Sequence, residues 1–266
     1  FYWRPHYNPV GSFTCTGGTL NANGGTVDFQ AYWATHNCLI RNAVFHNLTL
    51  GGAHSGSALN FETGATNTVL GDIRHTGGRV DKATWLLHGN LYVANAAYAG
   101  SSVARFISEE PQEIRFAPGA RAFGIAMDKP EGSTLTAVGG SCFLGGGDAW
   151  QNTFGGIALL SGVFDASGVT NFTVRTYNNV WTNAPEAVFK APGLVDIRGY
   201  LCRLHANGLV FSNLSFDVSD SRLMLQAGTT NTVTGDLKIR RSGLSDGTLE
   251  VKGDIYCERS DSYGVH

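Results

Sequence analysis

The chain contains an internal repeat, because residues 195–256 reproduce residues 27–92 in the same order. The offset between the copies changes only from 168 (195−27) to 164 (253−89), which two short deletions explain. The matching segments are Val27-Asp28-Phe29 with Val195-Asp196-Ile197, Phe45-His46-Asn47-Leu48-Thr49-Leu50 with Phe211-Ser212-Asn213-Leu214-Ser215-Phe216, Thr66-Asn67-Thr68-Val69 with Thr230-Asn231-Thr232-Val233, Gly71-Asp72-Ile73 with Gly235-Asp236-Leu237, and Gly89-Asn90-Leu91 with Gly253-Asp254-Ile255. A repeat that keeps its order requires equivalent neighbours for both copies, and stacked solenoid folds provide them.

The apolar residues form short alternating triplets, such as Leu48-Thr49-Leu50, Leu91-Tyr92-Val93 and Leu249-Glu250-Val251. Alternation with period two is typical of a half-buried β-strand. Gly, Asn and Ser separate the triplets, and no segment combines helical periodicity with helix caps. The sequence therefore predicts an all-β chain.

Many short strands fit either a β-sandwich or barrel, or a parallel β-helix. The repeat favours the β-helix, because a motif recurs in a coil stack each time the chain returns to an equivalent position. We therefore predict a right-handed parallel β-helix with projecting loops, formed by residues 1–266 as one domain. We expect this stack to continue beyond one or both ends. Two polar interruptions, at 109–111 and 128–132, are predicted to be the loops.

The composition argues against two classes of partner. Only 15% of the residues are charged, with 19 Lys and Arg against 21 Asp and Glu, so no basic excess attracts nucleic acid or anionic lipid. No apolar run approaches the roughly 18 residues that a membrane-spanning helix needs. We therefore expect neither nucleic-acid binding nor membrane insertion.

Several Gly-, Thr- and Asn-rich segments, among them 23–29, 211–215 and 247–255, resemble the β-helical repeats of large secreted bacterial surface proteins. Filamentous haemagglutinins and autotransporter passenger domains are examples of this class. The resemblance implies an extracellular, cell-surface structural rod without enzymatic activity. Such a rod is a filament subunit that associates with itself end to end, or a stalk segment of an adhesin.

The alternative function is that of a carbohydrate-active or carbohydrate-binding β-helix. We assign no catalytic residue, cofactor or metal ligand. Asp72 and Asp236 recur after glycine in both copies, which is typical of turn residues rather than of a catalytic pair. The eight histidines show no metal-ligand spacing, and the loose replacement of His75 by Ile239 in the second copy predicts a surface position.

Four asparagines, Asn47, Asn67, Asn213 and Asn231, are predicted to form amide ladders between successive coils. Asn47 and Asn213, together with Asn171, also match the N-glycosylation pattern, which remains an alternative role.

The five cysteines contain no C-x-x-C pair. They are interpreted as small buried apolar residues, with one or two disulfides as the alternative.

Aromatic residues within polar stretches are the candidates for contact with a partner. The predicted contact residues are Trp33, Trp85, Trp150 and Trp181, whose flat rings stack well on sugars or on a neighbouring subunit. The alternative is that they cover the edges of coils.

Overall fold

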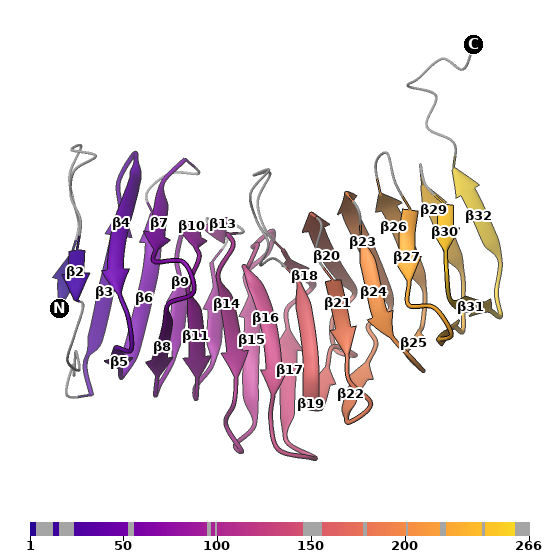
Figure 1. Cartoon of the computed structure of the whole chain (residues 1–266), viewed down its shortest axis with the longest axis horizontal. Coiled ribbons are helices and arrows are strands. Elements are labelled where there is room, and N and C mark those ends of the chain that lie inside the picture. The colour runs from indigo at the N-terminus through magenta and orange to yellow at the C-terminus, as the bar shows by residue number, and fades with distance from the viewer. Residues whose placement is uncertain are drawn as a thin grey trace, which may run out of the picture.

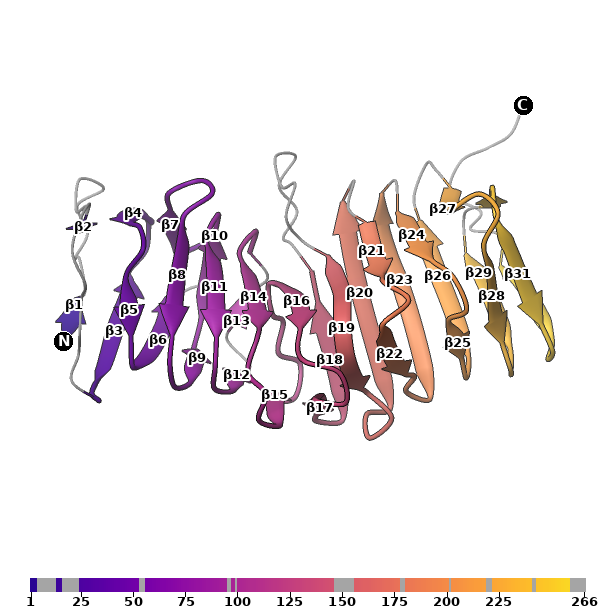
Figure 2. The same cartoon turned by 60° about the horizontal axis from the view of Figure 1, so that its bottom comes forward.

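The computed structural model describes most of the chain. The described residues are 1–3, 13–15, 24–52, 56–94, 97–98, 100–145, 156–177, 180–200, 202–218, 222–240 and 243–258. These residues form parallel strands that stack side by side along one long axis, from the N-terminal to the C-terminal end (Figures 1 and 2). The prediction of an all-β chain folded as a parallel β-helix is therefore confirmed.

Each coil of the helix visits three faces in turn. The first face contains β1 (Tyr2–Trp3), β3 (Thr26–Ala31), β6 (Asn47–Gly52), β9 (Ile73–His75), β12 (Leu91–Val93), β15 (Gln112–Phe116), β17 (Thr134–Val138), part of β19 (Ile157–Asp165), β22 (Ala187–Lys190), β25 (Val210–Phe211), β28 (Thr230–Val233) and β31 (Thr248–Val251). The second face contains β2 (Phe13–Cys15), β4 (Thr35–Ile40), β7 (Ala58–Phe61), β10 (Gly78–Asp81), β13 (Ala97–Tyr98), β18 (Ser141–Leu144), β20 (Asn171–Tyr177), β23 (Leu194–Tyr200), β26 (Leu214–Val218), β29 (Leu237–Arg240) and β32 (Ile255–Glu258). The third face contains β5 (Val44–Phe45), β8 (Thr66–Val69), β11 (Thr84–Leu87), β14 (Val103–Phe106), β16 (Gly124–Asp128), the remainder of β19, β21 (Val180–Asn183), β24 (Arg203–Ala206), β27 (Arg222–Leu225) and β30 (Gly243–Ser245).

Two features join the sheets where the coil pattern is irregular. Strand β19 crosses the corner between the third and first faces, pairing with β16 in its first half and β17 in its second. On the second face, Ala122 forms an isolated parallel bridge with Leu144 of β18, at the start of the C-terminal sheet of this face. The stack therefore continues through the middle of the chain.

In most strands, alternate side chains point into the interior and fill it. In β4, for example, His36, Cys38 and Ile40 are buried while Thr35, Asn37 and Leu39 are exposed. Inward-facing residues of the three faces meet in one apolar core that runs along the rod. Burial of apolar surface contributes about 25 cal/mol per Å², so this core is the main stabilising element.

The two repeat copies have the same strand pairing on different faces. In the first copy Val27 of β3 pairs with Leu48 of β6, and Leu48 pairs with Ile73 of β9, all on the first face. The matching pairs, Val195 with Leu214 and Leu214 with Leu237, lie in β23, β26 and β29 on the second face. The second copy is therefore advanced by one face around the rod, and its local register is unchanged.

The two predicted loops are connected by a buried lysine. Lys129 is 1% exposed, and its Nζ donates hydrogen bonds to the carbonyl oxygens of Ser108 and Glu110 and to Oε1 of Gln112, at 2.5, 2.9 and 2.7 Å. Burial lowers the pKa of Lys129 to about 8. The two loops therefore lie outside the paired strands, and the hydrogen bonds of Lys129 connect them across successive coils.

All five cysteines lie within described residues, and none of them forms a disulfide. Cys38, Cys142 and Cys202 are buried, Cys15 is half-buried and Cys257 is exposed. Burial raises the pKa of Cys38 and of Cys142 to about 12. The interpretation as small apolar residues therefore holds for the buried three, and the alternative with disulfides is wrong.

Candidate functional site

Side chains at one corner connect each coil to the next. In the first copy, the backbone N–H of Asp72 donates to Oδ1 of Asn47 (2.9 Å), and the N–H of Asn90 donates to Oδ1 of Asp72 (2.8 Å). The N–H of Glu113 then donates to Oδ1 of Asn90 at 2.8 Å. We call this line of side-chain-to-backbone bonds the corner column. Its side-chain oxygens accept hydrogen bonds from backbone N–H groups at the corner, where the strands end.

The second copy builds a corner column of the same kind. The N–H of Asp236 donates to Oδ1 of Asn213 (2.8 Å), and the N–H of Asp254 donates to Oδ1 of Asp236 (3.0 Å). Asn213 also donates through Nδ2 to the carbonyl oxygen of Gly193 at 2.8 Å. The repeated Asn and Asp residues thus occupy turns and bond to the adjacent coil.

Close approach at this corner explains the repeated glycines. A Cβ on Gly71 or Gly235 would lie within 3.0 Å of Oδ1 of Asn47 or Asn213, a distance that real Cβ atoms essentially never show. Glycine is therefore required beside each asparagine.

Asn67 and Asn231 lie at a different corner and are almost completely buried, at 1% and 0% exposure. Their Oδ1 atoms each accept a backbone N–H at 3.0 Å, from Ala43 and Leu209 respectively. Their Nδ2 atoms donate to carbonyl oxygens in the preceding coil. These amides bond to backbone groups and not to each other. Asn47 and Asn213 also bond to backbone groups, so the predicted amide-on-amide ladder is wrong for all four asparagines.

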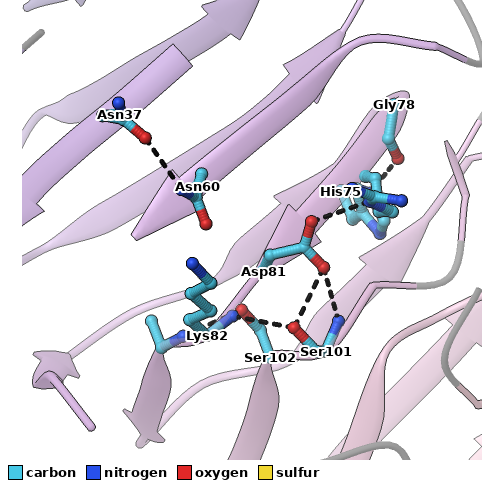
Figure 3. A network of polar contacts seen from close by, with 10 residues as sticks. Asn37, Asn60, His75, Gly78, Asp81, Lys82, Ser101 and Ser102 are labelled. Carbon is cyan, nitrogen blue, oxygen red and sulfur yellow. Dashed lines mark hydrogen bonds and ion pairs between the residues drawn. The ribbon is translucent and has the colours of Figure 1, made fainter. Parts of the chain in front are cut away.

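A direct amide-to-amide bond does occur at a place that the sequence analysis missed. Nδ2 of Asn60 donates to Oδ1 of Asn37 at 2.7 Å, between the neighbouring strands β7 and β4. Figure 3 shows this pair beside the turn between β10 and β11. Asn37 and Asn60 lie outside the repeated segments, so the repeat carried no signal for them.

Figure 3 also shows a buried polar cluster at that turn. Oδ1 of Asp81 accepts hydrogen bonds from the N–H and the hydroxyl of Ser101, at 2.9 and 3.0 Å. Nε of Arg79 donates to Oδ2 of Asp81 at 2.7 Å. Asp81 is only 5% exposed, and these three bonds satisfy both of its oxygens. The cluster therefore stabilises the turn.

His75 lies next to this turn and is fully buried, so the prediction of a surface position is wrong. Its Nε2 donates to the carbonyl oxygen of Gly78 (3.0 Å), while Nδ1 has no partner. The ring packs on Phe123 with centroids 5.3 Å apart. Burial lowers the pKa of His75 to about 4, because the charged ring is poorly solvated.

We expect His75 to make the protein acid-sensitive. The pKa of His75 is near 6.5 in the unfolded chain and about 4 in the fold. The neutral ring therefore contributes fully to the free energy of unfolding above pH 6.5, and this contribution is lost as the pH falls towards 4. The free energy of unfolding should fall by about 3 kcal/mol over this range. Urea titrations of the wild type and of His75→Gln between pH 4 and 7 measure this, since glutamine does not titrate. Equal pH slopes in the two proteins would rule out this role.

The four predicted contact tryptophans fall into three groups. Trp33 is 52% exposed, and Trp150 lies outside the described residues. Trp85 and Trp181 are 0% and 2% exposed, so their predicted role as contact residues is wrong. Both rings face the core, although polar residues lie nearby in the sequence.

Within the described residues, no cluster of three or more His, Cys, Asp or Glu side chains is arranged to hold a metal ion. In the same part of the chain, no helix has the length and apolar character needed to cross a membrane. Comparison with protein-family models, curated proteins and solved structures finds no match to this chain.

Proposed function

We propose that the protein is an extracellular structural rod, serving as a subunit of a surface filament or as a stalk segment of a large adhesin. The supporting observation is that successive coils are linked in two ways. Parallel ladders join the strands on each face, and the corner columns of both repeat copies add side-chain-to-backbone bonds at the turns. Such a stack resists bending and sliding without needing a large charged surface.

The last described coil supports growth by stacking. Ile255 and Cys257 of β32 pair with Leu237 and Ile239, which contact the core, yet both are exposed. A further coil laid against β32 would bury these two side chains and pair with the strand edge that has no partner among the described strands. The proposal assigns this contact either to more of the same chain or to a second copy.

Electron microscopy of the native material, combined with the intact mass of the chain, tests this function. Long unbranched fibres built from a chain of 28.3 kDa would identify a polymerising subunit. Rods within a much heavier chain would identify an adhesin stalk. Particles that neither form fibres nor belong to a longer rod would contradict the proposal.

For the fibre case, we expect Ile255→Asp to abolish end-to-end association, because a carboxylate would have to be buried between coils. Val188→Asp is the matched control, since Val188 is 51% exposed, close to the 58% of Ile255, but lies on the side of the rod. Sedimentation velocity of both variants measures the outcome. Fibres that survive Ile255→Asp would exclude this contact.

The proposal includes no catalytic role. A carbohydrate-active enzyme would depolymerise a glycan, so turnover of any member of a broad polysaccharide panel by the purified chain would overturn this part of the proposal.

A further inference from the structure

A hollow of about 740 Å³ is lined by residues of β26, β29 and β32. These strands lie near the C-terminal end of the rod (Figure 1). Ser215, Lys238 and Tyr256 occupy neighbouring positions on these three strands, in direct register. Asp236, Arg240 and Glu258 complete its polar lining. Its volume falls in the range of roughly 300–1,000 Å³ that is typical of small-molecule sites.

A buried hydroxyl in this hollow lacks a hydrogen-bond partner. Ser215 is 2% exposed, lines the hollow, and its Oγ is unpaired. An unsatisfied buried polar group costs about 1–3 kcal/mol, so this hydroxyl favours a ligand group that can form a hydrogen bond with it.

The charges of the hollow favour a neutral ligand. Lys238 and Arg240 balance Asp236 and Glu258, and both cations lie within ion-pair distance of Glu258. A phosphate or a uronic acid would meet no uncompensated cation, and a divalent cation would meet no excess of carboxylates. Hydroxyl groups suit this mixture, since each can donate to a carboxylate and accept from an ammonium or guanidinium group.

Tyr256 provides an apolar surface beside these polar groups. Its side chain is 50% exposed, and its hydroxyl is 3.3 Å from Oδ2 of Asp254, which holds one edge of the ring. A flat aromatic ring with a polar tip is well suited to contact the C–H face of a sugar ring while hydroxyls bond around it.

The first repeat copy contains a reduced version of the same hollow. Its volume is about 170 Å³, and Asn47, Thr49, Asp72 and Arg74 line it at the positions of Asn213, Ser215, Asp236 and Lys238. The tyrosine of the first copy, Tyr92, is half-buried. The Cζ atom of Arg74 lies over its ring, 4.8 Å from the ring centroid. The hollow of the first copy therefore lies below the roughly 300 Å³ typical of small-molecule sites, and the hollow of the second copy lies within the typical range.

From these observations we propose that the hollow over β26, β29 and β32 binds a short stretch of a neutral polysaccharide. One sugar ring lies on Tyr256, and its hydroxyls bond to Ser215 and to the Lys238–Glu258 pair. Ile255 and Cys257, which the stacking contact of the proposed function would bury, also line the hollow, so the binding test uses the unassembled chain.

The test uses the full chain on an array of neutral hexose oligosaccharides, with oligogalacturonates as acidic comparators, followed by calorimetric titration of the tightest neutral glycan. We expect Tyr256→Ala to weaken binding at least tenfold, Ser215→Ala to weaken it several-fold, and Tyr256→Phe to retain most of it. Thr49→Ala is the matched control in the first copy, and it should leave the affinity unchanged.

Three outcomes would overturn the proposal: no neutral glycan bound, a preference for the acidic glycans, or an affinity insensitive to Tyr256→Ala. Circular dichroism melting curves of each variant separate a lost contact from a lost fold. Because Tyr256 is exposed, its replacement should leave the melting curve unchanged. Electron microscopy reports on the rod function separately, so failure of glycan binding leaves that result unaffected.

Discussion

Trp85→Ala is expected to lower the free energy of unfolding by about 3–5 kcal/mol, the usual cost of emptying a large aromatic site in a core. Trp85 is fully buried, and its ring packs edge-on against Phe61 with centroids 4.8 Å apart. It also lies 6.4 Å from Phe45, so it closes a run of aromatic rings through the N-terminal coils. Urea denaturation followed by fluorescence measures the loss.

Two further substitutions make this prediction specific. Trp85→Phe should cost much less than Trp85→Ala, because the ring contacts remain and the buried indole N–H, which has no partner, is removed. Trp33→Ala, at a side chain that is 52% exposed, should change stability by less than about 1 kcal/mol. Equal losses at Trp33 and Trp85 would contradict the assignment of Trp85 to the core.

Asn231→Leu is expected to destabilise the second copy by about 2–4 kcal/mol. Leucine has a similar volume and is less polar, so the loss would come from hydrogen bonds and not from packing. The substitution leaves the N–H of Leu209 and the carbonyl oxygen of Ala206 buried without partners. Each unsatisfied backbone group costs about 1–3 kcal/mol. Urea denaturation gives the total, and hydrogen exchange at the amide of Leu209 reports the local effect.

Asn37→Leu provides the matched control for this substitution. Asn37 also accepts a hydrogen bond from another coil, but it is exposed, so water can replace the lost bond. We expect a change within about 0.5 kcal/mol there. Asn67→Leu should reproduce the large effect, because Asn67 makes the same two kinds of bond in the first copy. A small effect at both buried asparagines would show that the corners reorganise around the loss.

The sequence reasoning succeeded where the signal was local. Period-two alternation follows from strand geometry alone, and so the apolar triplets identified the strands. The repeated Gly-Asp and Asn residues marked the corners, because tight turns restrict residue type in every coil. The signal failed for His75, Trp85 and Trp181, where polar residues nearby in the sequence suggested exposure although the side chains are buried.

Three features could be recognised only in the folded structure. The partners of Asn67 and Asn231 are backbone groups more than 20 positions away in the chain, so no local pattern identifies them. Lys129 is buried by loops of two different coils, and its neighbours in sequence are polar. The hollow combines residues that lie as far apart in the chain as Leu194 and Glu258, so no local pattern identifies it.

The sequence by itself determined that this chain forms short strands, stacks them in equivalent coils and places Asn, Asp and Gly at the corners. These properties depend on side-chain alternation and turn geometry, which act over a few residues. The tertiary structure alone decided that the second copy lies one face further round the rod, which tryptophans are buried, and which copy has an open hollow. Those outcomes depend on how many residues each intervening coil uses and on contacts between residues that are distant in the chain.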